Sequence, residues 1–216
     1  MSTALTDRLA RCYTGVVHDV MRARGLRDFV LPPELRPILP AQTLAGPAFT
    51  IEGEAMPGSD PHATLLAWTG LLSKAPAGSV WVSQPNDRLV AHMGELSGET
   101  LKRKGVRGCV CDGGIRDVDF LMRLGFPCWA RFFTPRDIVG HWLPRATDVP
   151  ITIGEVRIEP GDFMLGDRDG LVRIPAGIVA DVVEAAEAAI GTENRVRTAI
   201  LAGMDPQEAY LRYGKF

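Results

Sequence analysis

The sequence predicts an α/β fold in which strands and helices alternate through the middle of the chain. Between residues 44 and 133, apolar runs of strand length are separated by segments with helical spacing or helix-start signals. Such alternation is typical of a largely parallel sheet covered by helices. The 216 residues are enough to bury a sizeable core and contain no internal repeat or linker-like tract. We therefore expect a single domain over residues 1–216.

Each element has a local reason. Apolar residues at helical spacing predict helical structure over 4–25, with a second helix starting at Thr14, whereas four prolines make 31–40 an irregular crossing loop. Asp60 as N-cap and Pro61 as first helical residue announce the helix between the first two strands. The remaining elements of this region follow in order: strands over 44–54 and 79–84, a helix over 93–105, a strand over 106–112, a helix over 116–125 and a strand over 127–133.

The rhythm changes after residue 148. Short β-branched runs are broken by turn signals at Ile153-Gly154, Pro160-Gly161-Asp162 and Asp169-Gly170, so a meander of three or four short strands packed against the first sheet is expected. A long helix or helix pair over 175–203 and a short helix over 206–214 complete the chain.

Composition excludes several classes of protein. The formal net charge is −2 and there is no long block of like charge, so neither a nucleic-acid surface nor a polybasic membrane patch is expected. No apolar run approaches the length of about 20 residues that crosses a bilayer, and the first residues lack the apolar core of a signal peptide. Cys12, Cys109, Cys111 and Cys128 show no C-x-x-C spacing and are expected to be reduced thiols. These features favour a cytoplasmic protein.

The stretch from Gly94 to Asp119 contains the strongest candidate site. Gly94 precedes a helix whose first N–H groups lack intrahelical partners and can bind an anion; alternatively, the glycine only permits a tight turn. A glycine turn at Gly113-Gly114 then delivers Arg116 and Asp117 at the end of a buried strand. An arginine binds carboxylates and an aspartate with waters holds Mg²⁺, although a helix-start aspartate beside a surface arginine is the plain alternative. Asp119 is expected either to be solvated or to support the site from behind the residues that touch the ligand.

Other polar residues are weaker candidates. No two histidines have the i, i+4 spacing of a zinc site, and His92 either lines the same cleft or is a satisfied or surface histidine. Cys109 and Cys111 alternate along one strand and are expected to be small core residues. The GD and DG pairs between residues 161 and 170 fit turns better than a calcium loop.

These motifs carry a family resemblance. The stretches GELSGETLKRKGVRGCVCDGGIRDVDFL, PCWARFFTP and VPITIGEVRIEPGDFMLGDRDGLVRIP resemble the class II pyruvate aldolases typified by 4-hydroxy-4-methyl-2-oxoglutarate/4-carboxy-4-hydroxy-2-oxoadipate aldolase, a family that includes the RraA-like regulators of ribonuclease E. The resemblance covers residues 14–204. It implies an α-β-β-α sandwich of the swivelling β/β/α type, assembled as a homotrimer or homohexamer with sites between subunits.

The resemblance also implies roles for individual residues. A divalent metal, Mg²⁺ or Mn²⁺, is held by Asp117, largely through water. Arg116 binds the pyruvoyl group of a small 2-oxo acid, whose carboxylate meets the turn of Gly94. The residues implied for that turn are Glu95, Leu96 and Ser97, with Glu95 also touching the metal's waters. Glu193 of an adjacent subunit is implied to touch those waters as well.

One position departs from the aldolases. The aldolases tend to carry a further acid three positions after the aspartate of the Arg-Asp pair, where this chain has Phe120, with Asp119 one place earlier. The resemblance implies a metal-dependent lyase that cleaves a 4-hydroxy-2-oxo acid to pyruvate and decarboxylates oxaloacetate. A non-catalytic, protein-binding regulator and a lyase for another hydroxy acid are the alternatives.

Overall fold

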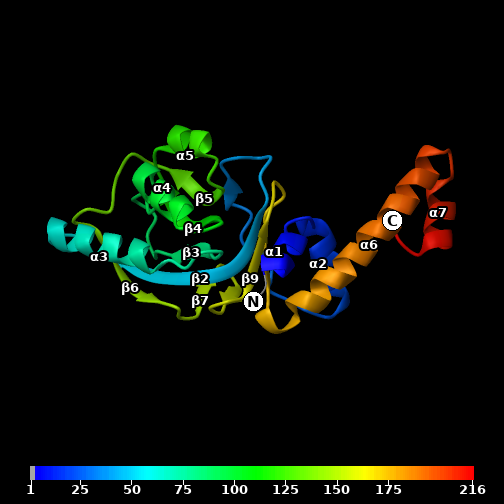
Figure 1. Cartoon of the computed structure of the whole chain (residues 1–216), viewed down its shortest axis with the longest axis horizontal. Coiled ribbons are helices and arrows are strands. Elements are labelled where there is room, and N and C mark those ends of the chain that lie inside the picture. The colour runs from blue at the N-terminus through cyan, green and yellow to red at the C-terminus, as the bar shows by residue number, and fades with distance from the viewer. Residues whose placement is uncertain (1–2) are drawn as a thin grey trace.

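The computed structural model describes residues 3–216 and has a mixed α/β fold built on a curled sheet (Figure 1). In the described residues the sheet has eight strands in the order β1-β5-β4-β3-β2-β9-β10, with β6 also paired to β2. Four neighbouring strands are mutually parallel, as predicted. They are β2 (Leu44–Ala55), β3 (Val80–Gln84), β4 (Gly108–Ile115) and β5 (Cys128–Phe133).

Strand β2 is shared by both parts of the sheet. Its 12 residues extend past β3, which pairs only with Ala48–Glu52. The overhanging residues Leu44–Pro47 pair instead with β9 (Phe163–Gly166), which continues antiparallel to β10 (Leu171–Ile174). Because the overhang would otherwise leave backbone groups unpaired, β9 completes the sheet.

The predicted meander after residue 148 is therefore wrong in arrangement. Only β7 (Ile151–Ile153) and β8 (Val156–Ile158) form a separate antiparallel pair, while β9 and β10 join the main sheet. The sheet is also less parallel than predicted, since β1 (Arg36–Pro37) and β6 (Trp142–Thr147) pair antiparallel with β5 and β2. Neither strand was predicted, because Pro37 and Pro144 lie in them and proline within a segment argues against a strand.

Helices cover the sheet in two groups (Figure 1). Those that connect the parallel strands enclose one core cluster with Trp68, Leu101 and Leu121, and the N-terminal helices enclose another with the long C-terminal helix. Asp60 caps the first connecting helix by accepting a hydrogen bond from Ala63 N at 2.7 Å, as predicted. The connecting helices are α3 (Pro61–Lys74), α4 (Glu95–Arg103) and α5 (Val118–Leu124), and the others are α1 (Thr3–Leu9), α2 (Thr14–Ala23), η1 (Ala176–Ile178), α6 (Val179–Leu201) and α7 (Pro206–Tyr213).

Two further expectations concern the cysteines and membranes. All four cysteines are buried and unpaired in the described part of the chain. Cys109 and Cys111 are fully enclosed core residues, and burial raises the pKa of both thiols. No helix within residues 3–216 is long and apolar enough to cross a membrane.

Candidate active site

The end of β4 presents Arg116 and Asp117, but not by the predicted glycine turn. Gly113 and Gly114 lie inside the strand, where the pairing with β5 shifts register. A Cβ at Gly114 would lie 2.6 Å from Phe132 Cε2 and 2.8 Å from Val90 O, so the glycine allows close packing. The turn prediction is wrong because the local pattern did not reveal this crowding.

Asp117 turns the chain from β4 into α5. Its backbone is left-handed, with φ 54° and ψ 38°, a conformation that aspartate tolerates better than most residues. The turn brings its carboxylate back over the start of α4, where Glu95 N donates to Asp117 Oδ2 at 3.1 Å. Such backbone strain clusters at functional sites.

The segment before α4 lies alongside β4. His92 N donates to Gly114 O at 2.8 Å, and Arg116 N donates to Met93 O at 2.9 Å. Gly94 follows with an ordinary extended φ of −154°, so its backbone does not require glycine. A Cβ there would instead lie 2.7 Å from Asp117 Oδ2, so the glycine makes room for the Arg116-Asp117 pair.

The first turn of α4 supplies backbone donors to the same place. Amide groups at the start of a helix have no acceptor four residues back. The amide of Glu95 is engaged by Asp117, which leaves the amides of Leu96 and Ser97 as the donors for an anion. The Ser97 hydroxyl accepts a hydrogen bond from Trp68 Nε1 at 3.0 Å, which fixes this turn against α3.

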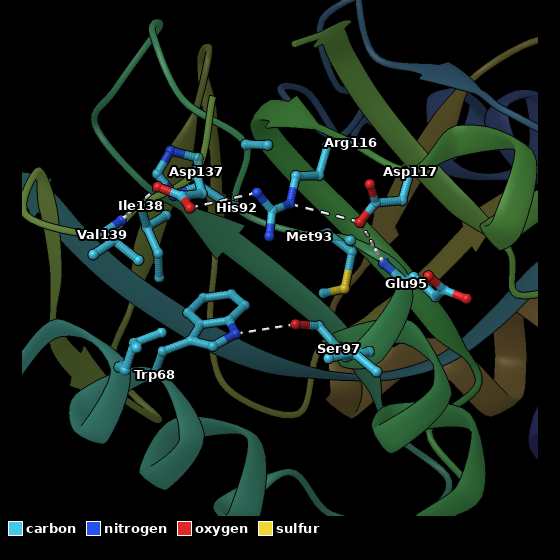
Figure 2. Close-up of a pocket in the computed structure, with 14 residues that line it drawn as sticks. Trp68, His92, Met93, Glu95, Ser97, Arg116, Asp117, Asp137, Ile138 and Val139 are labelled. Carbon is cyan, nitrogen blue, oxygen red and sulfur yellow. Dashed lines mark hydrogen bonds and ion pairs between the residues drawn. The ribbon is translucent and has the colours of Figure 1, made fainter. Parts of the chain in front are cut away.

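These groups surround a pocket of about 500 Å³ (Figure 2). The six site residues that were predicted to come from a single subunit all line this pocket. They come from the turn before α4 and from the end of β4. Leu65 and Trp68 of α3 add an apolar wall. The predicted lining residues are Gly94, Glu95, Leu96, Ser97, Arg116 and Asp117.

Asp137 is a pocket residue that was not predicted. Its Oδ2 lies 3.5 Å from Arg116 Nη1, while Arg116 Nε lies 3.6 Å from Asp117 Oδ2. The guanidinium is thus placed between two carboxylates (Figure 2). A signal existed in the sequence, because Asp137 follows β5, and the carboxyl ends of neighbouring parallel strands meet at one edge.

His92 also lines the pocket, and one of its two ring nitrogens has a hydrogen-bond partner. The side chain is 1% exposed, and Nε2 lies 3.2 Å from Asp87 Oδ2. The other oxygen of Asp87 lies 3.0 Å from His141 Nε2. Burial lowers the pKa of His92 to about 4, so the ring is neutral at pH 7. Burial opposes ionisation of Asp87, but hydrogen bonds from the amides of Val90 and Leu89 outweigh it and lower its pKa to about 2.

Glu193 lies outside this pocket in its own chain. It is on α6, where it accepts a hydrogen bond from the Tyr13 hydroxyl and pairs with Lys215 Nζ at 3.2 Å. Burial and the Glu193 contact raise the pKa of Tyr13 to about 12. The implied role of Glu193 belongs to an adjacent subunit and stays a prediction.

Asp119 and Phe120, the second and third residues after the Arg-Asp pair, face solvent. Asp119 is exposed, and Phe120 is 47% exposed with the Arg123 guanidinium 4.4 Å from its ring centre. Neither lines the pocket. The position at which the aldolases carry an acid is thus occupied here by an exposed aromatic ring.

The donor set fits a cation held through few protein ligands. No group of three or more histidine, cysteine, aspartate or glutamate residues poised for a metal occurs within residues 3–216. Mg²⁺ retains several waters and is usually bound by only one or two carboxylates. Asp117 and Glu95 offer two carboxylates at the pocket, which is compatible with that mode.

Comparisons with known proteins identify the family. The family model described as RraA-like, Aldolase/RraA, matches residues 14–173. Protein DlpA of Legionella pneumophila is 26% identical over 206 residues, which cover 95% of this chain but only 33% of DlpA. A Halalkalibacterium halodurans protein named "Putative 4-hydroxy-4-methyl-2-oxoglutarate aldolase" is 28% identical over 181 residues, covering 82% of this chain and 81% of the relative.

A solved structure supports the same assignment. RraAS2 of Streptomyces coelicolor, described as an unusual member of the RNase ES inhibitor RraA protein family, has a TM-score of 0.81 and 27% identity. The similarity covers 91% of this chain and 97% of RraAS2. Relatives of this chain thus carry the name of an aldolase and the name of an RNase inhibitor. The chain belongs to the aldolase/RraA family of RraA-like proteins.

Proposed function

We propose that this protein is a divalent-metal-dependent lyase that cleaves a 4-hydroxy-2-oxo acid to pyruvate and a second oxo compound. The observation that carries the proposal is the meeting, in one pocket, of Arg116, Asp117 and the first turn of α4. The guanidinium of Arg116 and the backbone amides at the start of α4 suit the keto oxygen and the carboxylate of a 2-oxo acid. The aldolase name of a relative at 28% identity supports the same chemistry.

The roles of the protein groups follow from their positions. The amides of Leu96 and Ser97 bind the substrate carboxylate, and Arg116 donates to the 2-keto oxygen. As carbon–carbon cleavage leaves negative charge on that oxygen, the guanidinium stabilises the enolate. Asp117 and Asp137 lie on either side of the Arg116 guanidinium.

The metal belongs beside Asp117. That carboxylate would hold the ion, with Glu95 and Glu193 of an adjacent subunit acting through water. When bound, Mg²⁺ or Mn²⁺ supplies Lewis-acid polarisation of the keto group. Oxaloacetate decarboxylation leads to the same enolate, so we expect the protein to have both activities. We expect the active form to be a homotrimer or homohexamer, because Glu193 would come from an adjacent subunit.

The test is pyruvate release from oxaloacetate and a panel of 4-hydroxy-2-oxo acids, with Mg²⁺, with Mn²⁺ and with chelator. We expect turnover that the chelator abolishes. Absence of pyruvate release from every compound in the presence of either metal would refute the proposal.

The second candidate is a protein-binding regulator of ribonuclease activity. It is favoured by the similarity to RraAS2 and by Phe120 at the position of an aldolase acid. It predicts inhibition of RNA cleavage by a purified ribonuclease E-type enzyme, without metal-dependent pyruvate release. The two assays together separate the candidates.

A further inference from the structure

Arg116 is held between two carboxylates that have different surroundings. Asp117 accepts a hydrogen bond from the amide of Glu95 at the start of α4, whereas Asp137 lies on the opposite side of the guanidinium (Figure 2). We propose that Asp137 is the catalytic base that takes the proton of the substrate's 4-hydroxyl group. This inference rests on the lyase function proposed above, and it assigns a residue of this chain to the proton step.

The local structure orients the Asp137 carboxylate through one of its oxygens and leaves the other able to accept a proton. Its Oδ1 accepts a hydrogen bond from Val139 N at 3.1 Å, which fixes the side chain relative to its own loop. Its Oδ2 lies 3.5 Å from Arg116 Nη1, longer than an ordinary charge-assisted hydrogen bond. The side chain is 45% exposed and lines the pocket, so this oxygen can accept a proton from a ligand.

The position beside Arg116 fits the substrate geometry. In a 4-hydroxy-2-oxo acid, the carbons that bear the keto and hydroxyl oxygens are separated by a single carbon. A substrate whose keto oxygen meets the guanidinium therefore places its hydroxyl close to the same guanidinium. Asp137 is on that side of the pocket, and a base must lie within hydrogen-bond reach of its proton.

The other candidate bases of this pocket are less well placed. His92 is 1% exposed, and its Nε2 faces Asp87. The carboxylate of Glu95 points away from Arg116 (Figure 2). Asp117 Oδ2 accepts the amide of Glu95, and this carboxylate is the group proposed to hold the metal. Among the carboxylates described at the pocket, Asp137 is thus the one beside the guanidinium without another assigned task.

The step conserves atoms and electrons. The hydroxyl proton moves to Asp137 Oδ2, and the electron pair of the O–H bond forms the new carbonyl at C4. The C3–C4 bond breaks, and its electron pair forms the C2–C3 double bond of the enolate while the keto π pair moves onto oxygen. C3 then takes a proton, which yields pyruvate and restores the carboxylate when Asp137 is the donor.

The test compares two reactions in the variant Asp137→Asn. Aldol cleavage needs removal of a hydroxyl proton, whereas oxaloacetate decarboxylation has no hydroxyl proton to remove. We expect kcat for aldol cleavage to fall by about 100-fold or more, the usual size of a lost general base, while decarboxylation changes by less than roughly threefold. Retained decarboxylation also demonstrates that the variant is folded and that Arg116 still works.

Two controls complete the design. Asp119→Asn removes an exposed carboxylate outside the pocket and should leave both rates unchanged. Pyruvate affinity, measured by calorimetry with Mg²⁺, should be the same in Asp137→Asn and wild type. Equal loss of both reactions would overturn the inference, because Asp137 would then act only by positioning Arg116, and unchanged aldol cleavage would overturn it as well. Failure of the lyase proposal is seen separately, as wild-type protein that releases no pyruvate from either substrate.

Discussion

Replacing Gly94 by alanine tests whether the turn before α4 and the end of β4 form one site. The backbone at Gly94 is extended, so alanine is not strained by its own conformation. Its Cβ would however lie 2.7 Å from Asp117 Oδ2 and 3.1 Å from Arg116 Cγ. Both contacts are too short, so the pair must move away from the turn.

The size of the effect follows from the contact that is lost. Displacing Asp117 breaks its hydrogen bond from Glu95 N, a charged bond worth about 1.5–3 kcal/mol. If the transition state needs this arrangement, kcat/KM for pyruvate release should fall roughly 10- to 100-fold, since about 1.4 kcal/mol corresponds to a factor of ten. Pyruvate is measured with a coupled lactate dehydrogenase assay.

A matched variant controls for the added methyl group. Gly70 lies in α3, and a Cβ there would meet nothing within 4 Å. Gly70→Ala should retain wild-type kcat/KM and gain up to about 1 kcal/mol of stability from better helix propensity. Wild-type activity in Gly94→Ala would refute the reasoning, because the close approach would then have no bearing on catalysis.

Three further predictions concern the site and its support. Arg116→Ala should reduce pyruvate release to background, and Asp117→Ala should remove the response to added Mg²⁺ or Mn²⁺ in calorimetric titration; near-wild-type behaviour in either variant would contradict its role. The free energy of unfolding, measured with urea, should decrease as the pH falls from 6.5 toward 4. The unfolded chain protonates His92 near 6.5, whereas the buried ring has a pKa of about 4, so protons favour unfolding by at most about 1.4 kcal/mol per pH unit. His92→Gln should flatten this dependence, and an unchanged slope would show that His92 is not its source.

The local sequence predicted the elements that local chemistry controls. Asp60 and Pro61 begin α3, and the four parallel strands lie close to the expected positions. Six of the seven predicted site residues, all except Glu193, meet in one pocket because a helix start and a strand end lie at the same edge of the sheet. Such features depend on spacing and residue type within one short segment.

Contacts between distant segments could not be predicted in the same way. The pair Gly113-Gly114 is typical of a turn, yet it lies within a strand. Glycine is needed at position 114 because a Cβ there would lie too close to Phe132 and Val90. The partner of β9 depends on how far β2 extends beyond β3, which no residue of β9 encodes. Asp137 becomes a site residue only when β5 is known to lie beside β4.

The length of β2 has a mechanical consequence for the whole molecule. Its first residues are hydrogen-bonded to β9 and its later residues to β3 and β6, so opening the sheet on either side disrupts the same strand. The layer that includes α1, α2 and α6 is therefore coupled to the layer that holds Arg116 and Asp117. Local unfolding that begins in the N-terminal helices would be transmitted through one continuous backbone to the parallel strands, of which β4 leads to Arg116 and Asp117.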